Sequence, residues 1–416
     1  MREDRDFLLE LFAAGLAAVD GRRRMRSVLA GRELADDVWL LAVGKAAAAM
    51  TLGALDALGP CVTRALVVSR RGYFGDELAQ YPQVTCMTGG HPLPDEGSLA
   101  AGAAALEMAQ QARREQPVLL LVSGGASSLM EVPPESISLA DLRKVSAWAL
   151  ASGLPIERVN AVRRRLSTIK DGRLMAAFAH CRVEGFFISD VPGDAAALVG
   201  SGLLAAGAGQ GSEAGLPDWV RELMARSPSG RPVPSAATVR CVGRLHDALA
   251  AIEQTALREG VRCQLRAERL EGDAVALAER LCGDAMRGPP QLLVGGGETT
   301  VRLPPSTGRG GRNQHLALAA ARIIAGRDDL TLLAAGTDGS DGNSEDAGAI
   351  VDGGTIERGR DAGLDPDACL GGADSGRFLE ASGDLVHTGA TATNVGDLVM
   401  VLRRDLGHSP PSGPSM

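Results

Sequence analysis

Short apolar runs alternate with longer helical patterns along the first half of the chain, and this alternation constrains the fold more than any other feature. Such an order is typical of an α/β fold built on a largely parallel sheet. We expect strands at Val38–Val43, Ala65–Ser69, Gln83–Met87, Val118–Ser123 and Gly185–Ser189, and helices at residues 4–19, 46–58, 97–114, 139–152 and 157–179.

The length of 416 residues exceeds what one ordinary core organises, so two domains are expected. A Pro-, Ser- and Gly-rich segment at residues 226–235 resembles an inter-domain linker. We therefore predict domains at residues 1–235 and 236–405, followed by a disordered tail at 406–416. The second domain is expected to contain helices at 243–259 and 272–287 and strands at 261–266, 330–335 and 397–402.

Composition excludes several classes of protein. Hydrophobic residues make up 45% and charged residues 23%, which is ordinary for a globular protein. Aromatic residues are only 3% and the net charge is −8, so a nucleic-acid partner is not expected. No run is long enough for a membrane span, and no membrane partner is expected. Seven scattered cysteines without metal-ligand spacing indicate a reduced, cytoplasmic protein.

Residues 291–315 combine glycines, arginines and an expected helix start. The apolar run Leu292–Val294 breaks into Gly295–Gly297, and Glu298 follows at once. Glycine-rich turns and helix starts present backbone N–H groups to anions, and arginine adds fork-shaped charge. We interpret this segment as a phosphate cradle; an ordinary Gly-rich hairpin before an exposed basic helix is the alternative. The residues assigned to the cradle are Gly296, Gly297, Glu298, Arg309, Arg312 and Asn313.

Lys45 stands out because only three of the 43 basic residues are lysines. It follows the expected strand Val38–Val43 and precedes an alanine-rich helix pattern. In open α/β sheets ligands collect at the carboxyl ends of strands, and an ammonium there suits a phosphoryl group. A lysine at a helix start in open solvent is the alternative.

A second strand end, after Val118–Val122, carries the small residues Ser123-Gly124-Gly125-Ala126-Ser127. These residues can wrap backbone N–H groups around phosphate oxygens, which predicts roles for Ser123, Gly124, Gly125 and Ser127. The segment is neither a Walker A loop nor the G-x-G-x-x-G dinucleotide fingerprint. A tight strand–helix turn that simply requires small residues is the alternative.

Two aspartates follow expected strands. Asp190 comes after Phe186–Ser189 and is a candidate for a divalent metal ligand, a proton acceptor or a helix cap. Asp338 lies in the loop Gly336–Gly348, which has no EF-hand frame. Such a loop fits nucleotide–Mg²⁺ or polar-substrate binding, with a plain acidic surface turn as the alternative.

Nine segments in order along nearly the whole chain resemble the glycerate 2-kinase family, whose C-terminal half is the MOFRL domain. Relative to the family pattern, Asp194 is followed by three alanines, and Ser69–Tyr73 is rearranged. The matching segments are VGKAAAAM (43–50), GGHPLPDEG (89–97), LVSGGASSLM (121–130), ERVNAVRRRLSTIKDGRL (157–174), ISDVPGD (188–194), GGGETTVRL (295–303), GRGGRNQHLALAAA (308–321), AAGTDGSDGNSEDAGAIVD (334–352) and TGATATNVGDL (388–398).

This resemblance implies phosphorylation of D-glycerate at its C2 hydroxyl by ATP with Mg²⁺, giving 2-phosphoglycerate and ADP. It implies an N-terminal Rossmann-like α/β/α domain with a mostly parallel sheet, a C-terminal α/β (MOFRL) domain and an active site in the cleft between them. The family's catalytic residues carry over to Lys45, Arg312 and Asp338. Asp190 is the expected metal ligand, and a homodimer is a candidate assembly.

Phosphoryl transfer depends mainly on positioning and electrostatics, so Lys45 and Arg312 are expected to clamp the transferring group. Asp190, Asp338 or Glu298 would accept the hydroxyl proton or anchor Mg²⁺, and Arg309 would pair with a carboxylate or a phosphate. Two other classes remain open: an oxidoreductase acting on hydroxypyruvate or glycerate, and a non-catalytic module that senses a phosphorylated sugar.

Overall fold

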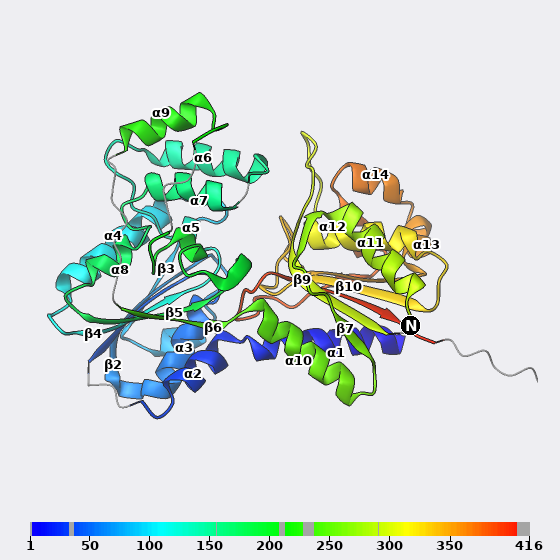
Figure 1. Cartoon of the computed structure of the whole chain (residues 1–416), viewed down its shortest axis with the longest axis horizontal. Coiled ribbons are helices and arrows are strands. Elements are labelled where there is room, and N and C mark those ends of the chain that lie inside the picture. The colour runs from blue at the N-terminus through cyan, green and yellow to red at the C-terminus, as the bar shows by residue number, and fades with distance from the viewer. Residues whose placement is uncertain are drawn as a thin grey trace, which may run out of the picture. The chain divides into compact units, whose positions relative to one another are not determined.

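The computed structural model describes residues 2–32, 37–154, 156–207, 213–227, 237–289 and 291–405. The chain forms two compact units, each described here by itself (Figure 1). The parallel-sheet unit comprises Ala18–Leu245 and Ala390–Val395; the mixed-sheet unit comprises Met1–Ala17, His246–Gly389 and Gly396–Met416. Helix α1 (Arg2–Ala18) therefore belongs mainly to the mixed-sheet unit. The segment Ala390–Val395, although late in the chain, belongs to the parallel-sheet unit. Most of the expected linker and the expected tail lie outside the described residues.

The sheet of the parallel-sheet unit has six strands in the order β3-β2-β1-β4-β5-β6, and every pairing is parallel. The expected α/β fold with a mostly parallel sheet is confirmed. From β1 the chain winds outward through β2 and β3, and it then returns to build β4, β5 and β6 on the other side. The winding direction reverses between β1 and β4. The strands are β1 Val38–Val43, β2 Val62–Ser69, β3 Val84–Thr88, β4 Pro117–Val122, β5 Arg182–Ile188 and β6 Thr238–Gly243.

The helices of this unit include several with strong local signals. Asp95 caps α4 through Ser98, and Ser138 caps α6 through Asp141, each in a reciprocal capping box. The expected single helix at 157–179 is wrong: it divides into α7 and α8, because Asp171 and Gly172 adopt left-handed backbone angles with φ of 62° and 79°. The helices are α2 Gly21–Leu29, α3 Ala47–Leu58, α4 Glu96–Gln111, α5 Ala126–Leu129, α6 Leu139–Ala151, α7 Ile156–Arg165, α8 Arg173–Ala177 and α9 Asp218–Arg226.

The mixed-sheet unit has a sheet in the order β12-β11-β10-β13-β9-β7, with β8 also paired to β9. Pairings among β12, β11, β10, β13 and β9 are antiparallel, whereas β7 and β8 run parallel to β9. The strands are β7 Cys263–Leu265, β8 Leu270–Asp273, β9 Leu292–Thr300, β10 Leu330–Gly336, β11 Gly348–Asp352, β12 Leu385–Val386 and β13 Asp397–Arg403.

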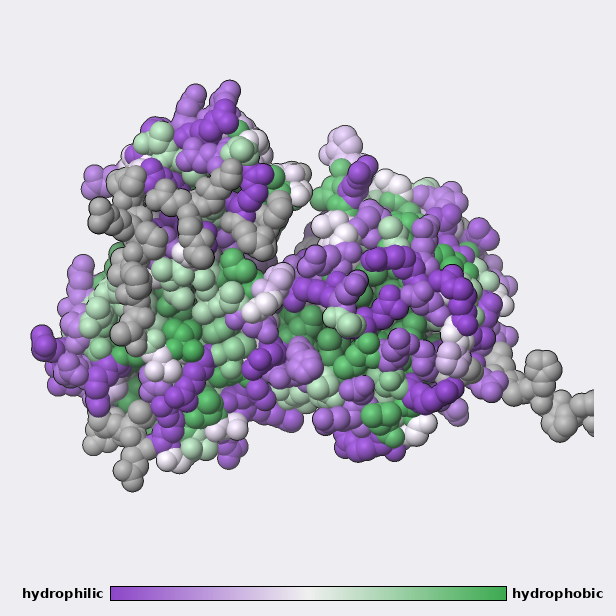
Figure 2. All heavy atoms as spheres, in the orientation of Figure 1, coloured by the Kyte–Doolittle hydropathy of each residue, from purple (hydrophilic) through white to green (hydrophobic). Residues whose placement is uncertain are grey.

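The core of this unit lies between the sheet and helices α11 and α12, where Leu281, Leu316 and Leu332 are almost fully buried. Hydrophilic side chains dominate the surface of this unit that faces the viewer in Figure 2. Among the described residues, no helix is both long enough and apolar enough to cross a bilayer. The helices are α1 Arg2–Ala18, α10 Leu245–Arg258, α11 Ala274–Arg287, α12 Arg312–Ile323, α13 Thr355–Asp361, α14 Pro366–Gly371 and α15 Ser375–Ala381.

The three glycines Gly295–Gly297 do not interrupt the apolar run Leu292–Val294, as the sequence suggested, but lie in the same strand. They continue strand β9 and pair with Val399, Leu398 and Asp397 of β13. A Cβ atom on Gly297 would overlap with the carbonyl oxygen of Leu270 in β8, and one on Gly295 would lie 3.0 Å from the Leu270 side chain. Gly295 and Gly297 are therefore explained by the close passage of Leu270 of β8 along β9.

Candidate active site

The carboxyl ends of three neighbouring parallel strands carry the residues expected for chemistry in the parallel-sheet unit. Lys45 follows β1, the segment Ser123–Gly125 follows β4, and Asp190 follows β5. Since β1 and β4 are adjacent and the winding direction reverses between them, Lys45 and Ser123 flank the switch point. Ligands of open α/β sheets bind in the crevice at this position.

The loops after β1 and β4 are bonded to each other. The backbone N–H of Lys45 donates to the carbonyl of Gly124 at 2.9 Å, and the N–H of Ala46 donates to Ser123 Oγ at 3.0 Å. Gly44 has φ of 129°, and a Cβ atom there would overlap with Ser123 Oγ. Glycine is therefore required at position 44 both by its backbone angle and by the close approach of the second loop.

Gly124 and Gly125 lie among functional side chains. A Cβ atom on Gly124 would overlap with Asn394 Nδ2 and Asp190 Oδ2. Gly125 has φ of 85°, and a Cβ atom there would stand 3.2 Å from His91 Cδ2 and 3.3 Å from Lys45 Cγ. The glycines of this loop therefore allow side chains from four other segments to approach its backbone closely.

Two members of this group, His91 and Asn394, were not assigned a role from the sequence. Asn394 Nδ2 donates to Asp190 Oδ2 at 3.0 Å. Its segment is fixed to the parallel-sheet unit because Thr393 Oγ1 donates to the carbonyl of Val19 at 2.7 Å. Both residues lie in segments that carried the family resemblance, which was the available signal, but no spacing rule connects Asn394 to a strand end about 200 residues earlier in the chain.

The hydroxyl of Ser127 already has a protein partner. Ser127 Oγ lies 2.7 Å from Ser201 Oγ, and Ser201 Oγ donates to Asn160 Oδ1 at 2.8 Å. This chain of hydrogen bonds ties the loop after β4 to helix α7. Ser127 therefore holds the loop in place, and its assignment to phosphate binding stays a prediction.

The donor set at the end of β5 fits the magnesium ion that the resemblance implies. Asp190 supplies a carboxylate at a strand end, next to the amide of Asn394. No group of three or more His, Cys, Asp or Glu side chains in the described part of the chain could hold a metal ion. Mg²⁺ in nucleotide sites is commonly held by one or two carboxylates together with phosphate oxygens and water, so a single protein carboxylate suffices.

Arg312, in the mixed-sheet unit, is engaged with two carboxylates. Its Nε donates to Asp397 Oδ2 at 2.5 Å and its Nη2 to Asp397 Oδ1 at 3.1 Å, while Nη2 also donates to Glu298 Oε1 at 2.9 Å. The Asp397 side chain is only 7% exposed, whereas that of Arg312 is 34% exposed. Burial alone would lower the pKa of Arg312, but Asp397 and Glu298 raise it well above its usual value. The guanidinium is therefore oriented and permanently charged.

The start of helix α12 is capped by a buried carboxylate. Asp341 accepts hydrogen bonds from the backbone N–H of Asn313 at 3.1 Å and of Gln314 at 2.8 Å, and from Asn313 Nδ2 at 3.3 Å. Burial raises the pKa of Asp341 to about 7, although the N–H bond from Gln314 opposes the shift. The expectation that these N–H groups await an external anion is wrong, because a protein carboxylate occupies them.

The turn before α12 is likewise occupied by acidic partners. Arg309 Nη1 donates to Glu380 Oε2 at 3.0 Å, and Arg309 Nη2 lies 3.5 Å from Asp346 Oδ2. The backbone N–H of Arg309 donates to Asp374 Oδ1 at 2.8 Å. Carboxylates therefore outnumber guanidinium groups at this turn, and its role in phosphate binding stays a prediction.

Asp338 follows strand β10 and is 6% exposed. Its Oδ1 accepts the backbone N–H of Ser340 at 3.0 Å, which closes a short Asx-type turn. The predicted residues thus fall into two groups. Lys45, Ser123, Gly124, Gly125, Ser127 and Asp190 lie in the parallel-sheet unit, and Gly296, Gly297, Glu298, Arg309, Arg312, Asn313 and Asp338 lie in the mixed-sheet unit.

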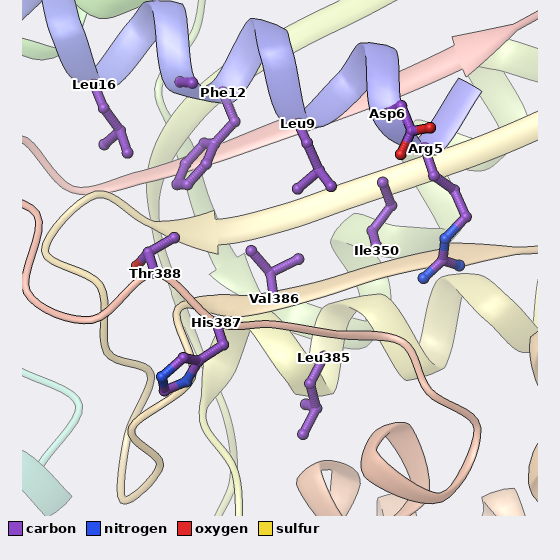
Figure 3. Close-up of a pocket in the computed structure, with 11 residues that line it drawn as sticks. Arg5, Asp6, Leu9, Phe12, Leu16, Ile350, Leu385, Val386, His387 and Thr388 are labelled. Carbon is purple, nitrogen blue, oxygen red and sulfur yellow. The ribbon is translucent and has the colours of Figure 1, made fainter. Parts of the chain in front are cut away.

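A pocket of about 580 Å³ in the mixed-sheet unit contains none of these residues (Figure 3). Its lining is mainly apolar, with Leu9 and Phe12 from α1 opposite Val386 of β12. Arg5 at its rim is already bonded to Asp384 at 2.7 Å. Without a predicted site residue in its lining, this pocket is not the candidate active site.

The parallel-sheet unit is a doubly wound α/β fold, and it carries a lysine, a glycine loop and an aspartate at or beside its switch point. These features define a ligand-binding protein of the doubly wound α/β class. The domain family of unknown function DUF4147 matches residues 7–215, and the MOFRL family matches residues 291–397. The D-glycerate 2-kinase of Thermotoga maritima is 32% identical over 95% of this chain and 97% of its own length.

A putative hydroxypyruvate reductase of Agrobacterium vitis is 34% identical over 96% of this chain and 94% of its own length. The crystal structure of a glycerate kinase from Thermotoga maritima superposes with a TM-score of 0.80 at 31% identity, covering 97% of this chain and 100% of that one. The chain belongs to the glycerate 2-kinase family, with a MOFRL domain in its second half.

Proposed function

We propose that the protein is a kinase that transfers the γ-phosphoryl group of ATP to the C2 hydroxyl of D-glycerate, giving 2-phosphoglycerate and ADP. The observation that carries the proposal is the site at the switch point between β1 and β4, where Lys45 adjoins the loop Ser123–Gly125. The names of the related D-glycerate 2-kinase and glycerate kinase support the same activity.

Lys45 is proposed to stabilise negative charge on the phosphoryl group as it moves. Its ammonium is carried on a flexible stem from a strand end, and its backbone is held to Gly124. The transition state of phosphoryl transfer spreads charge over peripheral oxygens, so a positioned cation lowers its free energy directly. Ser123, Gly124 and Gly125 are proposed to contact nucleotide phosphates through their backbone.

Asp190 is proposed to hold Mg²⁺, which when bound neutralises charge on the phosphate oxygens. Asp338 is proposed to accept the proton of the substrate hydroxyl. Arg312 is proposed as the second catalytic cation, which Asp397 and Glu298 hold in one orientation. Gly296, Gly297, Arg309 and Asn313 remain predicted nucleotide contacts.

The cellular setting is also proposed. ATP is the expected nucleotide, and the cytoplasm is the expected compartment because all seven cysteines are free thiols, as is usual in a reducing compartment. A homodimer is the proposed assembly, and sedimentation of the purified protein would test it. D-glycerate and the nucleotide are the expected small-molecule partners.

A hydroxypyruvate reductase is the second candidate, because two similar relatives carry the name putative hydroxypyruvate reductase. A dinucleotide-dependent reductase of this topology would need a glycine-rich turn after β1, and here that turn is Val43-Gly44-Lys45-Ala46, without the G-x-G-x-x-G pattern. Purified protein should form ADP from ATP in the presence of D-glycerate and Mg²⁺. With hydroxypyruvate, it should leave the absorbance of NADH and NADPH unchanged. Oxidation of either cofactor, without formation of ADP in the first assay, would show that the protein is a reductase and not a kinase.

A further inference from the structure

Beside the loop after β4, the parallel-sheet unit contains a small cavity of about 20 Å³. Ser127 and Ser128 of that loop form one side of it, and Arg163 of helix α7 forms another. The buried residues Glu131 and Lys170 also line the cavity, as does Ser146. A volume of this size accommodates about one water-sized atom, such as a single oxygen of a carboxylate, so only the end of a ligand can enter it.

The cavity contains one more positive charge than negative charge. Glu131 and Lys170 form an ion pair and are only 3% and 2% exposed. Both oxygens of Glu131 are used: Oε2 accepts from Lys170 Nζ, and Oε1 accepts from Ser167 Oγ and from the backbone N–H of Val132. Glu131 therefore has little capacity left for a second cation.

Arg163 is that second cation. Within the part of the chain that the structure describes, its side chain makes no hydrogen bond or ion pair. Burial lowers the pKa of Arg163, and the nearby charge of Glu131 only partly opposes this effect. A partly desolvated guanidinium without its own counter-ion is costly, and an anion from outside the protein relieves that cost.

Helix α7 fixes Arg163 relative to the strand-end site. Asn160, one helical turn earlier on the same face, accepts a hydrogen bond from Ser201, which in turn contacts Ser127. The loop that carries Ser127 begins at Ser123 and Gly124, beside Lys45. The cavity therefore adjoins the proposed phosphate-transfer site within one unit.

We infer that Arg163 binds the carboxylate of the substrate, so that this cavity is the subsite that selects a hydroxy acid over a neutral polyol. The inference rests on the proposed function and names a recognition element for it. Guanidinium matches carboxylate in shape and charge, whereas an amide or a hydroxymethyl group would leave Arg163 uncompensated. In D-glycerate the carboxylate and the C2 hydroxyl are on adjacent carbons, so binding the first positions the second next to the loop after β4.

The test compares Arg163→Gln with wild type, using D-glycerate, ATP and the neutral analogue glyceramide. Loss of one charge-assisted bond should raise the KM for D-glycerate by about 10- to 100-fold and leave the KM for ATP within about twofold. The preference for D-glycerate over glyceramide should fall by a similar factor. Arg165→Gln is the matched control on the same helix, since Arg165 Nε donates to the carbonyl of Met224 and does not line the cavity.

An unchanged KM for D-glycerate in Arg163→Gln, or equal changes in both KM values, would overturn the inference. If Arg163→Gln does not fold, Arg163→Lys supplies the answer: a raised KM for D-glycerate supports the subsite, and a wild-type KM overturns it. If wild-type protein does not phosphorylate D-glycerate, the proposed function fails separately. Calorimetric titration then compares the affinities of the protein for D-glycerate and for glyceramide. Tighter binding of D-glycerate that Arg163→Gln abolishes supports the subsite, and equal affinities of the wild-type protein for the two compounds exclude it.

Discussion

Two glycine-rich regions of this chain look alike in sequence and differ in structure. The loop Ser123–Gly125 is a strand-end turn whose glycines allow Lys45, His91 and Asp190 to approach the backbone closely. The region Gly295–Asn313 combines a strand with a turn whose arginines and N–H groups are already bonded to carboxylates. The difference indicates that glycines in such a pattern specify close approach of the backbone. Whether the N–H groups and arginines of the pattern are free to bind an anion depends on carboxylates elsewhere in the chain.

The comparison predicts its largest effect at Lys45. Replacement by alanine should lower kcat by about a thousandfold or more, because a positioned cation is lost from the transition state. The melting temperature should stay near that of wild type. Steady-state kinetics measures kcat, and calorimetry measures the melting temperature. Lys144→Ala is the control, because the ammonium of Lys144 lies over the Trp219 ring and is assigned no role in the site. Wild-type turnover in folded Lys45→Ala would remove the lysine from the proposed site.

A second effect, on stability, is expected at Gly44. Alanine there must adopt a positive φ and would overlap with Ser123 Oγ, so unfolding free energy should fall by at least about 2 kcal/mol. Gly72 is the control, since it also has a positive φ but open space around its Cβ position, and its replacement should cost about 1 kcal/mol. Equal losses measured by urea unfolding would show that the two loops do not meet as described.

Arg312 should differ from Lys45 in that its removal also destabilises the protein. Arg312→Met leaves the buried carboxylate of Asp397 without its guanidinium, and a loss of about 1–3 kcal/mol is expected, reduced from that of a fully buried pair by the exposure of Arg312. Arg312→Met combined with Asp397→Asn should recover part of that stability. Equal stability of Arg312→Met and wild type would show that the pair does not hold the start of α12.

A further effect concerns the dependence of stability on pH. The pKa of Asp341 in the folded protein is raised by burial to about 7, above its unfolded value near 4, so the folded state binds the proton more tightly. Its contribution to stability is therefore full below about pH 4 and is lost as pH rises towards 7. The slope is at most about 1.4 kcal/mol per pH unit. Asp341→Asn should flatten the melting temperature between pH 5 and 7, and an unchanged slope would contradict this origin.

The positions of the strand ends in the first sheet could be predicted from the sequence. Apolar runs such as Val38–Val43 and Val118–Val122 predict buried parallel strands. Because parallel strands end at the same edge of a sheet, the residues that follow these runs must lie at that edge. The sequence therefore predicts that Lys45, Ser123 and Asp190 lie at the same edge of the sheet.

The partners of the second region could not be predicted in this way. Asp397 pairs with Arg312 across 85 residues and Asp341 caps α12 across 28, and no local rule of spacing links them. The position of the triple glycine inside a strand could not be predicted either, because a strand that accommodates a closely passing neighbour has the same composition as a phosphate loop. The return of residues 390–395 to the parallel-sheet unit, which brings Asn394 to Asp190, depends on tertiary contacts alone.

The central claim is that the switch-point site transfers a phosphoryl group to the C2 hydroxyl of D-glycerate. Phosphorus NMR of the reaction of purified protein with ATP, Mg²⁺ and D-glycerate tests it directly, because the two monophosphorylated products have distinct resonances and proton couplings. The account predicts the resonances of ADP and 2-phosphoglycerate, absent with Lys45→Ala. Formation of 3-phosphoglycerate, or an ATP spectrum that does not change, would contradict it.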